Sequence, residues 1–148
     1  MSHDTSEAGW SPQGPVLELS DQASWDLLAS KNFGHLALSN AVRPDIFPVN
    51  YYCDKETILF RTASGSKLHE ITENIHVAFE VDAHTPDNVW SVVAQGLAAV
   101  LNGDHPVTAQ ALEALPDWVP VESFMYISIK PHTIRGRLFE NHLKIGHA

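Results

Sequence analysis

ILFRTASGSK, residues 58–67, joins a run of apolar residues to a cluster of polar and basic ones. The first three residues are typical of a strand, and the turn at Gly65 is typical of the start of a helix. The basic side chains of Arg61 and Lys67, the hydroxyl groups between them and the free N–H groups of a helix N-terminus are groups that bind phosphate. The segment therefore indicates either a phosphate site or an ordinary capped helix start, and its surroundings have to decide between the two.

Length and composition indicate one globular domain. The chain has 148 residues, of which 44% are hydrophobic and 18% are charged. These values suit a single domain with a well-filled core and argue against extensive disorder. Residues 1–15 are rich in Ser, Gly and Pro and show no hydrophobic periodicity, so we predict a flexible N-terminal arm there and a single domain over residues 16–148.

The charge and the cysteine content exclude several classes of partner. Nine basic and eighteen acidic side chains give a net charge of −9, which opposes binding to nucleic acid or to an anionic membrane. A small anion can still be bound where two or three basic groups gather. Cys53 is the sole cysteine, so an intrachain disulfide and a cysteine-rich metal site are impossible. No stretch approaches the roughly 20 apolar residues of a membrane span. We expect a cytoplasmic protein.

Hydrophobic periodicity predicts more strands than helices. A first helix is expected to begin at Ser20 and to end at Gly34. Two further short helices are expected from Ser66 and from Pro106. The predicted strands cover residues 35–39, 46–53, 57–62, 76–82, 89–101, 124–130 and 133–138.

The predicted strands follow one another with connections mostly of hairpin length and without a βαβ rhythm. A small antiparallel barrel of six to seven strands, with a few short peripheral helices, closes such a set naturally. Pro48 cannot donate to a ladder and is expected at an edge, a bulge or a barrel rim. Gly96 lies near the middle of the longest predicted strand and is expected at a bend.

Three segments together resemble a known family. They are PDIFPVNYYCDKETILFRTASGSKLHEITENIHVAFEVD (residues 44–82), WSVVAQGLAAV (90–100) and PHTIRGRLF (131–139). In this order they are similar to the FMN-binding split-barrel family of the pyridoxamine 5′-phosphate oxidase type, especially its small, nitroimidazole-reductase-like members. The resemblance covers roughly residues 19–139. It implies a mainly β, α+β fold with a split antiparallel β-barrel, and a homodimer that binds FMN between its two barrels.

The resemblance also implies which residues bind the cofactor. Some match positions that hold the FMN phosphate, others match the strands that line or approach the isoalloxazine ring, and one is similar to a late basic residue of the site. The residues that match the phosphate positions are Arg61, Thr62, Ser66 and Lys67. The residues on the strands that line or approach the ring are Val49, Asn50, Trp90 and Ser91. The late basic residue is Arg137.

Two departures from the family pattern bear on the substrate. The fuller oxidases carry another basic residue beside the phosphate lysine, where this chain has Ser66. They also end in an Arg-Leu-His motif with further basic residues, where this chain reads RLFE from Arg137 to Glu140. Oxidation of vitamin B6 is therefore less expected than another reaction of a bound flavin.

A flavin performs the hydride or electron transfer itself, so the protein needs no acid–base pair of its own. The resemblance implies an FMN-dependent oxidoreductase that passes electrons from a reduced nicotinamide to a small electrophile such as a nitroaromatic or a quinone. Two alternatives stay open. One is a deazaflavin-dependent reductase of the same fold, and the other is a non-catalytic flavin-binding or redox-sensing module.

Other interpretations compete for individual residues. Arg61 could form an ion pair with Glu70 or Glu73, and Trp90 could fill the core. The nine histidines are scattered along the chain and form no HExxH or comparable motif, so no metal site is expected. A Walker-type phosphate loop and a G-x-S-x-G nucleophile elbow are both absent from the sequence.

Overall fold

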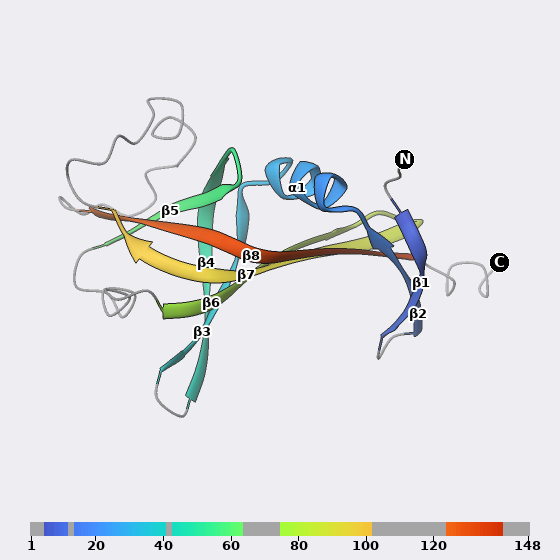
Figure 1. The fold of residues 1–148 in the computed structure, drawn as a ribbon, viewed down its shortest axis with the longest axis horizontal. Helices are drawn as coiled ribbons and strands as arrows, with labels where there is room; N and C mark the ends of the chain where they lie inside the picture. Colours follow the sequence, from blue (N-terminus) through green and yellow to red (C-terminus); the bar gives the residue numbers. More distant parts are fainter. Residues whose placement is uncertain (1–4, 12–13, 41–42, 64–74, 102–123, 141–148) are drawn as a thin grey trace.

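A computed structural model describes residues 5–11, 14–40, 43–63, 75–101 and 124–140 (Figure 1). These residues form one helix and eight strands, in agreement with a mainly β fold. Their bounds are β1 (Thr5–Ser11), β2 (Gly14–Leu19), α1 (Asp21–Ala29), β3 (Phe33–Asn40), β4 (Arg43–Asp54), β5 (Thr57–Ala63), β6 (Ile75–His84), β7 (Asn88–Val100) and β8 (Phe124–Glu140).

The strands form an antiparallel sheet that closes on itself. The order is β1-β2-β8-β5-β4-β3-β6-β7, and an additional pairing between β7 and β8 joins the ends of the last six strands into a ring. The β1–β2 hairpin extends the sheet beyond β8, outside the ring. This arrangement confirms the predicted antiparallel split β-barrel. β1 and the start of β2 lie within residues 1–15, where the sequence predicts a flexible arm; the flexibility of this segment stays a prediction.

The split in the barrel lies between β4 and β5. The first part of β4 pairs with β3, whereas pairing with β5 covers only the hairpin end, from Asp54↔Thr57 to Tyr51↔Phe60. A turn at Lys55, whose φ angle is 58°, connects these two strands. Pro48 lies in the part of β4 that pairs with β3 alone, opposite His35. Its missing N–H therefore falls on a local strand edge, as predicted.

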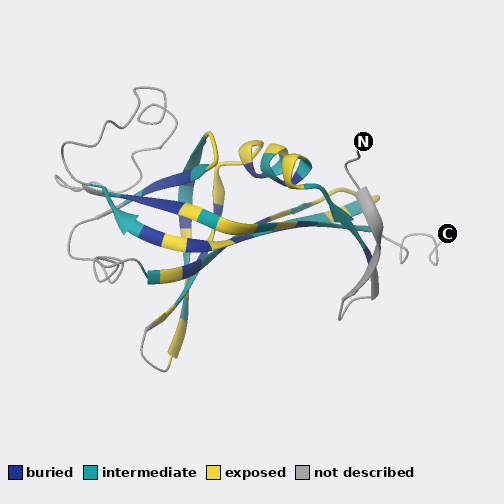
Figure 2. Cartoon of the chain, viewed as in Figure 1, coloured by how far each residue is buried: buried dark blue, intermediate teal, exposed yellow. Residues whose placement is uncertain are grey.

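The core fills the ring with side chains from alternate positions of the six ring strands and from α1 (Figure 2). The aromatic residues Tyr51, Phe60 and Phe79 are almost fully buried. The rings of Tyr51 and Phe79 meet edge to face with centroids 4.9 Å apart, and the Tyr51 hydroxyl donates to the carbonyl of Leu28 on α1. This buried hydrogen bond ties the helix to the barrel.

Helix α1 begins where the sequence predicts and ends earlier. The Ser20 side chain accepts a hydrogen bond from the backbone N–H of Ala23 at 3.1 Å, which confirms Ser20 as the N-cap. The helix ends at Ala29, and the prediction that Gly34 ends it is wrong. Gly34 lies in β3, where a Cβ atom would come within 2.8 Å of the Glu80 carbonyl oxygen. Glycine is needed there for the close approach of β6.

The C-terminal region forms one strand where two were predicted. β8 continues through Pro131, and its register with β7 shifts between Gln95 and Gly96. Gly96 pairs with Pro131 and Gln95 with Thr133, so His132 is the extra residue of a β-bulge. A bulge accommodates a proline without ending the strand, which explains the difference. The bend predicted at Gly96 is confirmed as this bulge.

The other two predicted helices lie in segments 64–74 and 102–123, outside the described residues, apart from Ile75, which begins β6.

We predict that the bulge depends on the absence of a side chain at position 96. A Cβ atom there would meet the Lys130 carbonyl oxygen and come within 2.6 Å of Pro131 Cα, both of which are backbone atoms of β8. Gly96→Ala should lower the free energy of unfolding by about 2 kcal/mol or more, measured by urea denaturation.

Gly136→Ala is the matched control, because the nearest obstacle there is the Ser24 hydroxyl of α1, a side-chain atom that can be removed. The double variant Ser24→Ala/Gly136→Ala should be more stable than the sum of the two single effects predicts. Equal losses for both glycine variants, with no coupling to Ser24, would contradict this explanation.

Candidate functional site

The first group of predicted site residues lies where β4 and β5 part. Tyr51 and Phe60 are the last paired residues of the two strands. Val49 and Asn50 precede Tyr51 on β4, and Arg61 follows Phe60 on β5.

Alternation along the two strands separates these residues by face. Val49 shares the inner face with Tyr51 and is only 8% exposed, so it belongs to the core. Asn50 and Arg61 lie on the opposite, outer face, and both are half-buried. Thr62 follows Arg61 in the backbone of β5, although its side chain lies outside the described part. Ser66 and Lys67 lie outside the described residues altogether. The structure thus brings an amide and a guanidinium together on one face at the split.

The second group lies on neighbouring positions of β7 and β8. Ser91 pairs directly with Arg137, and Trp90 pairs with Leu138. Trp90 is half-buried and packs against the hydrophobic core, as its alternative interpretation proposed. Ser91 and Arg137 share the outer face of the barrel.

The two groups lie far apart within one chain. Arg61 pairs with Tyr126 near the start of β8, and Ser91 pairs with Arg137 near its end. The path along β8 between these two partners is about 35 Å at the usual rise of a strand. Figure 1 shows β8 along the long axis of the molecule, with β5 against its first part and the β1–β2 hairpin against its last. One chain therefore assembles each group but not both.

A cationic pocket surrounds Arg137. Arg135 donates three hydrogen bonds to the Glu18 carboxylate of β2, two to Oε1 at 2.7 and 3.0 Å and one to Oε2 at 3.3 Å. Arg137 Nε lies 3.8 Å from Glu18 Oε1. Arg137 Nε is nevertheless buried and has no hydrogen-bond partner among the described residues. The pocket has a volume of about 420 Å³, and Gln95 and Thr133 also line it. It offers an unused N–H donor to an anion or a carbonyl oxygen.

Sequence reasoning identified Arg137 but missed Arg135 and Glu18. The alternation Arg135-Gly136-Arg137 could have indicated that both guanidinium groups share one face of a strand. Glu18 carried no such signal, because only the pairing of β2 with β8 brings it to that face.

The sequence model of the pyridoxamine 5′-phosphate oxidase family matches residues 20–138. The chain belongs to this family.

Solved structures and a curated relative are similar to this chain. An FAD-binding protein from Mycobacterium smegmatis has a TM-score of 0.74 and 34% identity, over 84% of this chain and 98% of its own. An uncharacterized protein from Mycobacterium tuberculosis is 30% identical over 85% of this chain and 88% of its own. A Bacteroides thetaiotaomicron protein named for 5-nitroimidazole antibiotic resistance shares the fold, with a TM-score of 0.69 and 10% identity over 92% and 91% of the two chains.

A cluster of titratable side chains lies beside Ser91, which belongs to the second group of predicted site residues. Glu80 of β6 lies 3.3 Å from His35 Nδ1 on β3, and Asp82 is two residues further along β6, paired with Ser91. Burial is the main cause that raises the pKa of the Glu80 carboxyl group to about 7. A hydrogen bond that protonated Glu80 donates to Asp82, and repulsion between the two carboxylates, raise this pKa further, whereas His35 lowers it. Glu80 therefore changes its charge near neutral pH.

Neither a reactive thiol nor a metal site with three or more protein ligands is found among the described residues. Burial raises the pKa of the Cys53 thiol to about 12, so it stays protonated and is a poor nucleophile at neutral pH. The described part contains no group of three or more His, Cys, Asp or Glu side chains arranged to hold a metal ion.

Nowhere in the described ranges is there a helix with the length and apolar character to span a membrane.

We predict that Glu80 makes the stability of the fold depend on pH. Its pKa is about 7 in the folded chain and near the ordinary value of 4.5 in the unfolded chain, so the folded state binds the proton more tightly. The contribution of Glu80 to the free energy of unfolding should therefore be largest below about pH 4.5 and should be lost as the pH rises through about 7. Glu80→Gln should remove this loss and raise the melting temperature relative to the wild type at about pH 8.

Glu56→Gln is the control for this measurement, because Glu56 is exposed in the β4–β5 turn. Its melting temperature should follow the wild-type pH profile. A Glu80→Gln profile parallel to that of the wild type between about pH 5 and 8 would refute the role of Glu80.

Proposed function

We propose that this chain binds a flavin nucleotide, FMN, with the flavin phosphate beside Arg61. The observation that carries the proposal is the split between β4 and β5, which leaves Asn50 and Arg61 half-buried on one outer face. A guanidinium group pairs well with phosphate because its donors match two oxygen atoms at once. The 34% identical relative from Mycobacterium smegmatis is an FAD-binding protein, which supports a flavin as the ligand class.

The flavin site is proposed to lie between two copies of the chain. The two groups of residues are about 35 Å apart along β8, a distance that one FMN molecule does not span. Two antiparallel copies would place Arg61 of one chain near Arg137 of the other. Exposed apolar side chains on the outer surface support such a contact, including Phe33 (41% exposed), which pairs with Asn50, and Ile46 (68% exposed).

Arg137 supplies a test of whether a flavin fits. Its buried Nε lacks a hydrogen-bond partner among the described residues, and a buried unpaired donor is costly. The carbonyl and ring nitrogen atoms of an isoalloxazine are acceptors of the kind that this N–H requires. Ser91 and the amide of Gln95 would line the same side of the ring.

A bound flavin supplies hydride or electron transfer at its ring. The residues of this chain would hold the phosphate through Arg61, orient the polar edge of the ring through Asn50 and neutralise negative charge through Arg137. We propose an oxidoreductase that takes electrons from a reduced nicotinamide and delivers them to a small electrophile, such as a nitroaromatic or a quinone. Ser66 and Phe139, at positions where fuller oxidases carry basic or histidine side chains, disfavour vitamin B6 oxidation.

The cofactor assignment predicts a selective effect of Arg61. Arg61→Ala should weaken FMN at least tenfold, about 1.4 kcal/mol, while leaving riboflavin almost unaffected, because riboflavin lacks the phosphate. Quenching of flavin fluorescence measures both dissociation constants. Arg43→Ala, which removes an exposed arginine at the start of β4, is the matched control. Equal losses for FMN and riboflavin, or no flavin binding by the wild type, would contradict the assignment.

The mass of the chromophore released from the purified protein distinguishes FMN from FAD. Rapid anaerobic bleaching by NADH or NADPH, followed by turnover with a quinone, would support the oxidoreductase. Bound flavin without either reaction would instead indicate a non-catalytic flavin module.

The dimer predicts a linked loss of assembly and cofactor. Ile46→Asp places a charge in the exposed apolar surface, so it should convert a dimer to a monomer in analytical ultracentrifugation and release the flavin. Lys55→Asp, an equivalent acidic change in the exposed β4–β5 turn, should do neither. A wild-type monomer that holds flavin would contradict the shared site.

A further inference from the structure

A second pocket lies on the surface of the barrel and adjoins the Arg137 pocket at Gln95, which lines both. It spans β3, β4, β6, β7 and β8 and has a volume of about 370 Å³. Its walls are mainly small or apolar, from residues such as Ala37, Val77 and Ala78. Two histidines, His76 of β6 and His132 of β8, are its only titratable lining residues in the described part of the chain.

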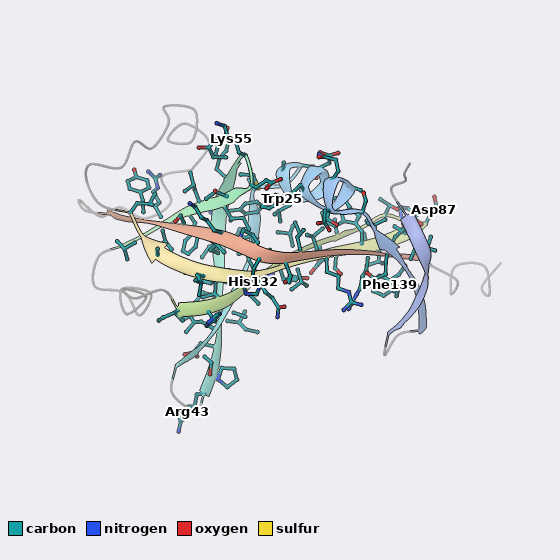
Figure 3. All side chains as sticks on the ribbon, viewed as in Figure 1. Trp25, Arg43, Lys55, Asp87, His132 and Phe139 are labelled. Carbon is teal, nitrogen blue, oxygen red and sulfur yellow. The ribbon has the colours of Figure 1, made fainter. Side chains whose placement is uncertain are left out.

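The bulge in β8 explains why these two histidines meet. β7 lies between β6 and β8. His76 of β6 pairs with Leu97 of β7, and Leu97 pairs with Lys130 of β8, two residues before His132. His132 is the residue that the bulge inserts, and its ring lies with its centroid 6.2 Å from that of His76, at an interplanar angle of 64°. Figure 3 shows His132 at the middle of β8. Bulges often redirect a side chain toward a functional site.

The geometry points to a divalent transition-metal site at this pair: we propose that His76 and His132 together bind an ion such as Zn²⁺. Each imidazole nitrogen binds zinc at about 2.0–2.1 Å, which places the ion about 3 Å from each ring centre. At the tetrahedral angle that zinc prefers, the two ring centres would lie about 5 Å apart, about 1 Å closer than the observed 6.2 Å. Both side chains are exposed, so small rotations that align the nitrogen atoms would not disturb the core.

The chemistry of the pair limits the kind of site. No third His, Cys, Asp or Glu completes a metal-binding group within the described ranges. The remaining coordination positions would therefore be held by water or by an external ligand, which is an open, exchangeable arrangement. Imidazole suits zinc, copper and nickel, whereas magnesium and calcium prefer oxygen ligands. The net charge of −9 favours the approach of any cation.

Zinc titration by isothermal calorimetry tests the site in the full chain at about pH 7.5. His76→Ala and His132→Ala should each weaken the same Zn²⁺ site at least tenfold, with one equivalent lost from the stoichiometry. His84→Ala is the matched control, because His84 is also exposed on β6 but lies outside the pocket. It should leave this site unchanged.

Two further measurements keep the result unambiguous. Thermal melting should show that all three variants fold as the wild type does. In NMR spectra of the wild type, Zn²⁺ should shift the ring signals of His76 and His132 together and Mg²⁺ should shift neither. Zinc affinity and stoichiometry that are the same in His76→Ala, His132→Ala and the wild type would overturn the proposal.

Discussion

The pairing of β8 with β7 is the interaction on which the rest of the molecule depends. It runs from Asn88↔Glu140 to Val100↔Ile127 and joins the two ends of a six-stranded ring. The same strand pairs on its other edge with β5 near its start and with β2 near its end. β8 therefore closes the core and also fixes where Arg61 and Arg137 lie relative to each other. The close contact at Gly96 and Pro131 lets so long a strand follow the curve of the barrel.

Local patterns in the sequence predicted much of the fold. Alternation of apolar residues located the ring strands, and Ser20 marked the start of α1 because its side chain can cap free N–H groups. The failures have a different cause. Gly34 and Pro131 carry the signals of a helix end and a strand break, but each is placed by contact with a distant strand. The β1–β2 hairpin was missed because its first strand lacks hydrophobic alternation.

The candidate site was predictable only in part, for similar reasons. The run from Ile58 to Lys67 indicated phosphate chemistry from its residue types, and the family likeness added Asn50 and Arg137. The structure places Asn50 and Arg61 on one face, which no spacing in the sequence could show. Several contacts join residues that are remote in the chain. They are the ion pairs of Glu18, the contact of Glu80 with His35 and the ring contact of His76 with His132. Such contacts follow from strand register, and single-sequence patterns contain little information about register.

Because Arg61 pairs with the start of β8 and Arg137 lies near its end, we propose that each flavin site takes Arg61 from one chain and Arg137 from its partner. Mixed dimers test this most directly: Arg61→Ala and Arg137→Ala chains, carrying different affinity tags, are each assayed for FMN and then co-expressed and isolated as heterodimers. In a shared arrangement one of the two sites in the heterodimer keeps both arginines, so FMN binding should recover to about half of the wild-type stoichiometry. If both residues served a flavin within the same chain, every site would keep one defect, and heterodimers that bind FMN as poorly as the two parent variants would contradict the account.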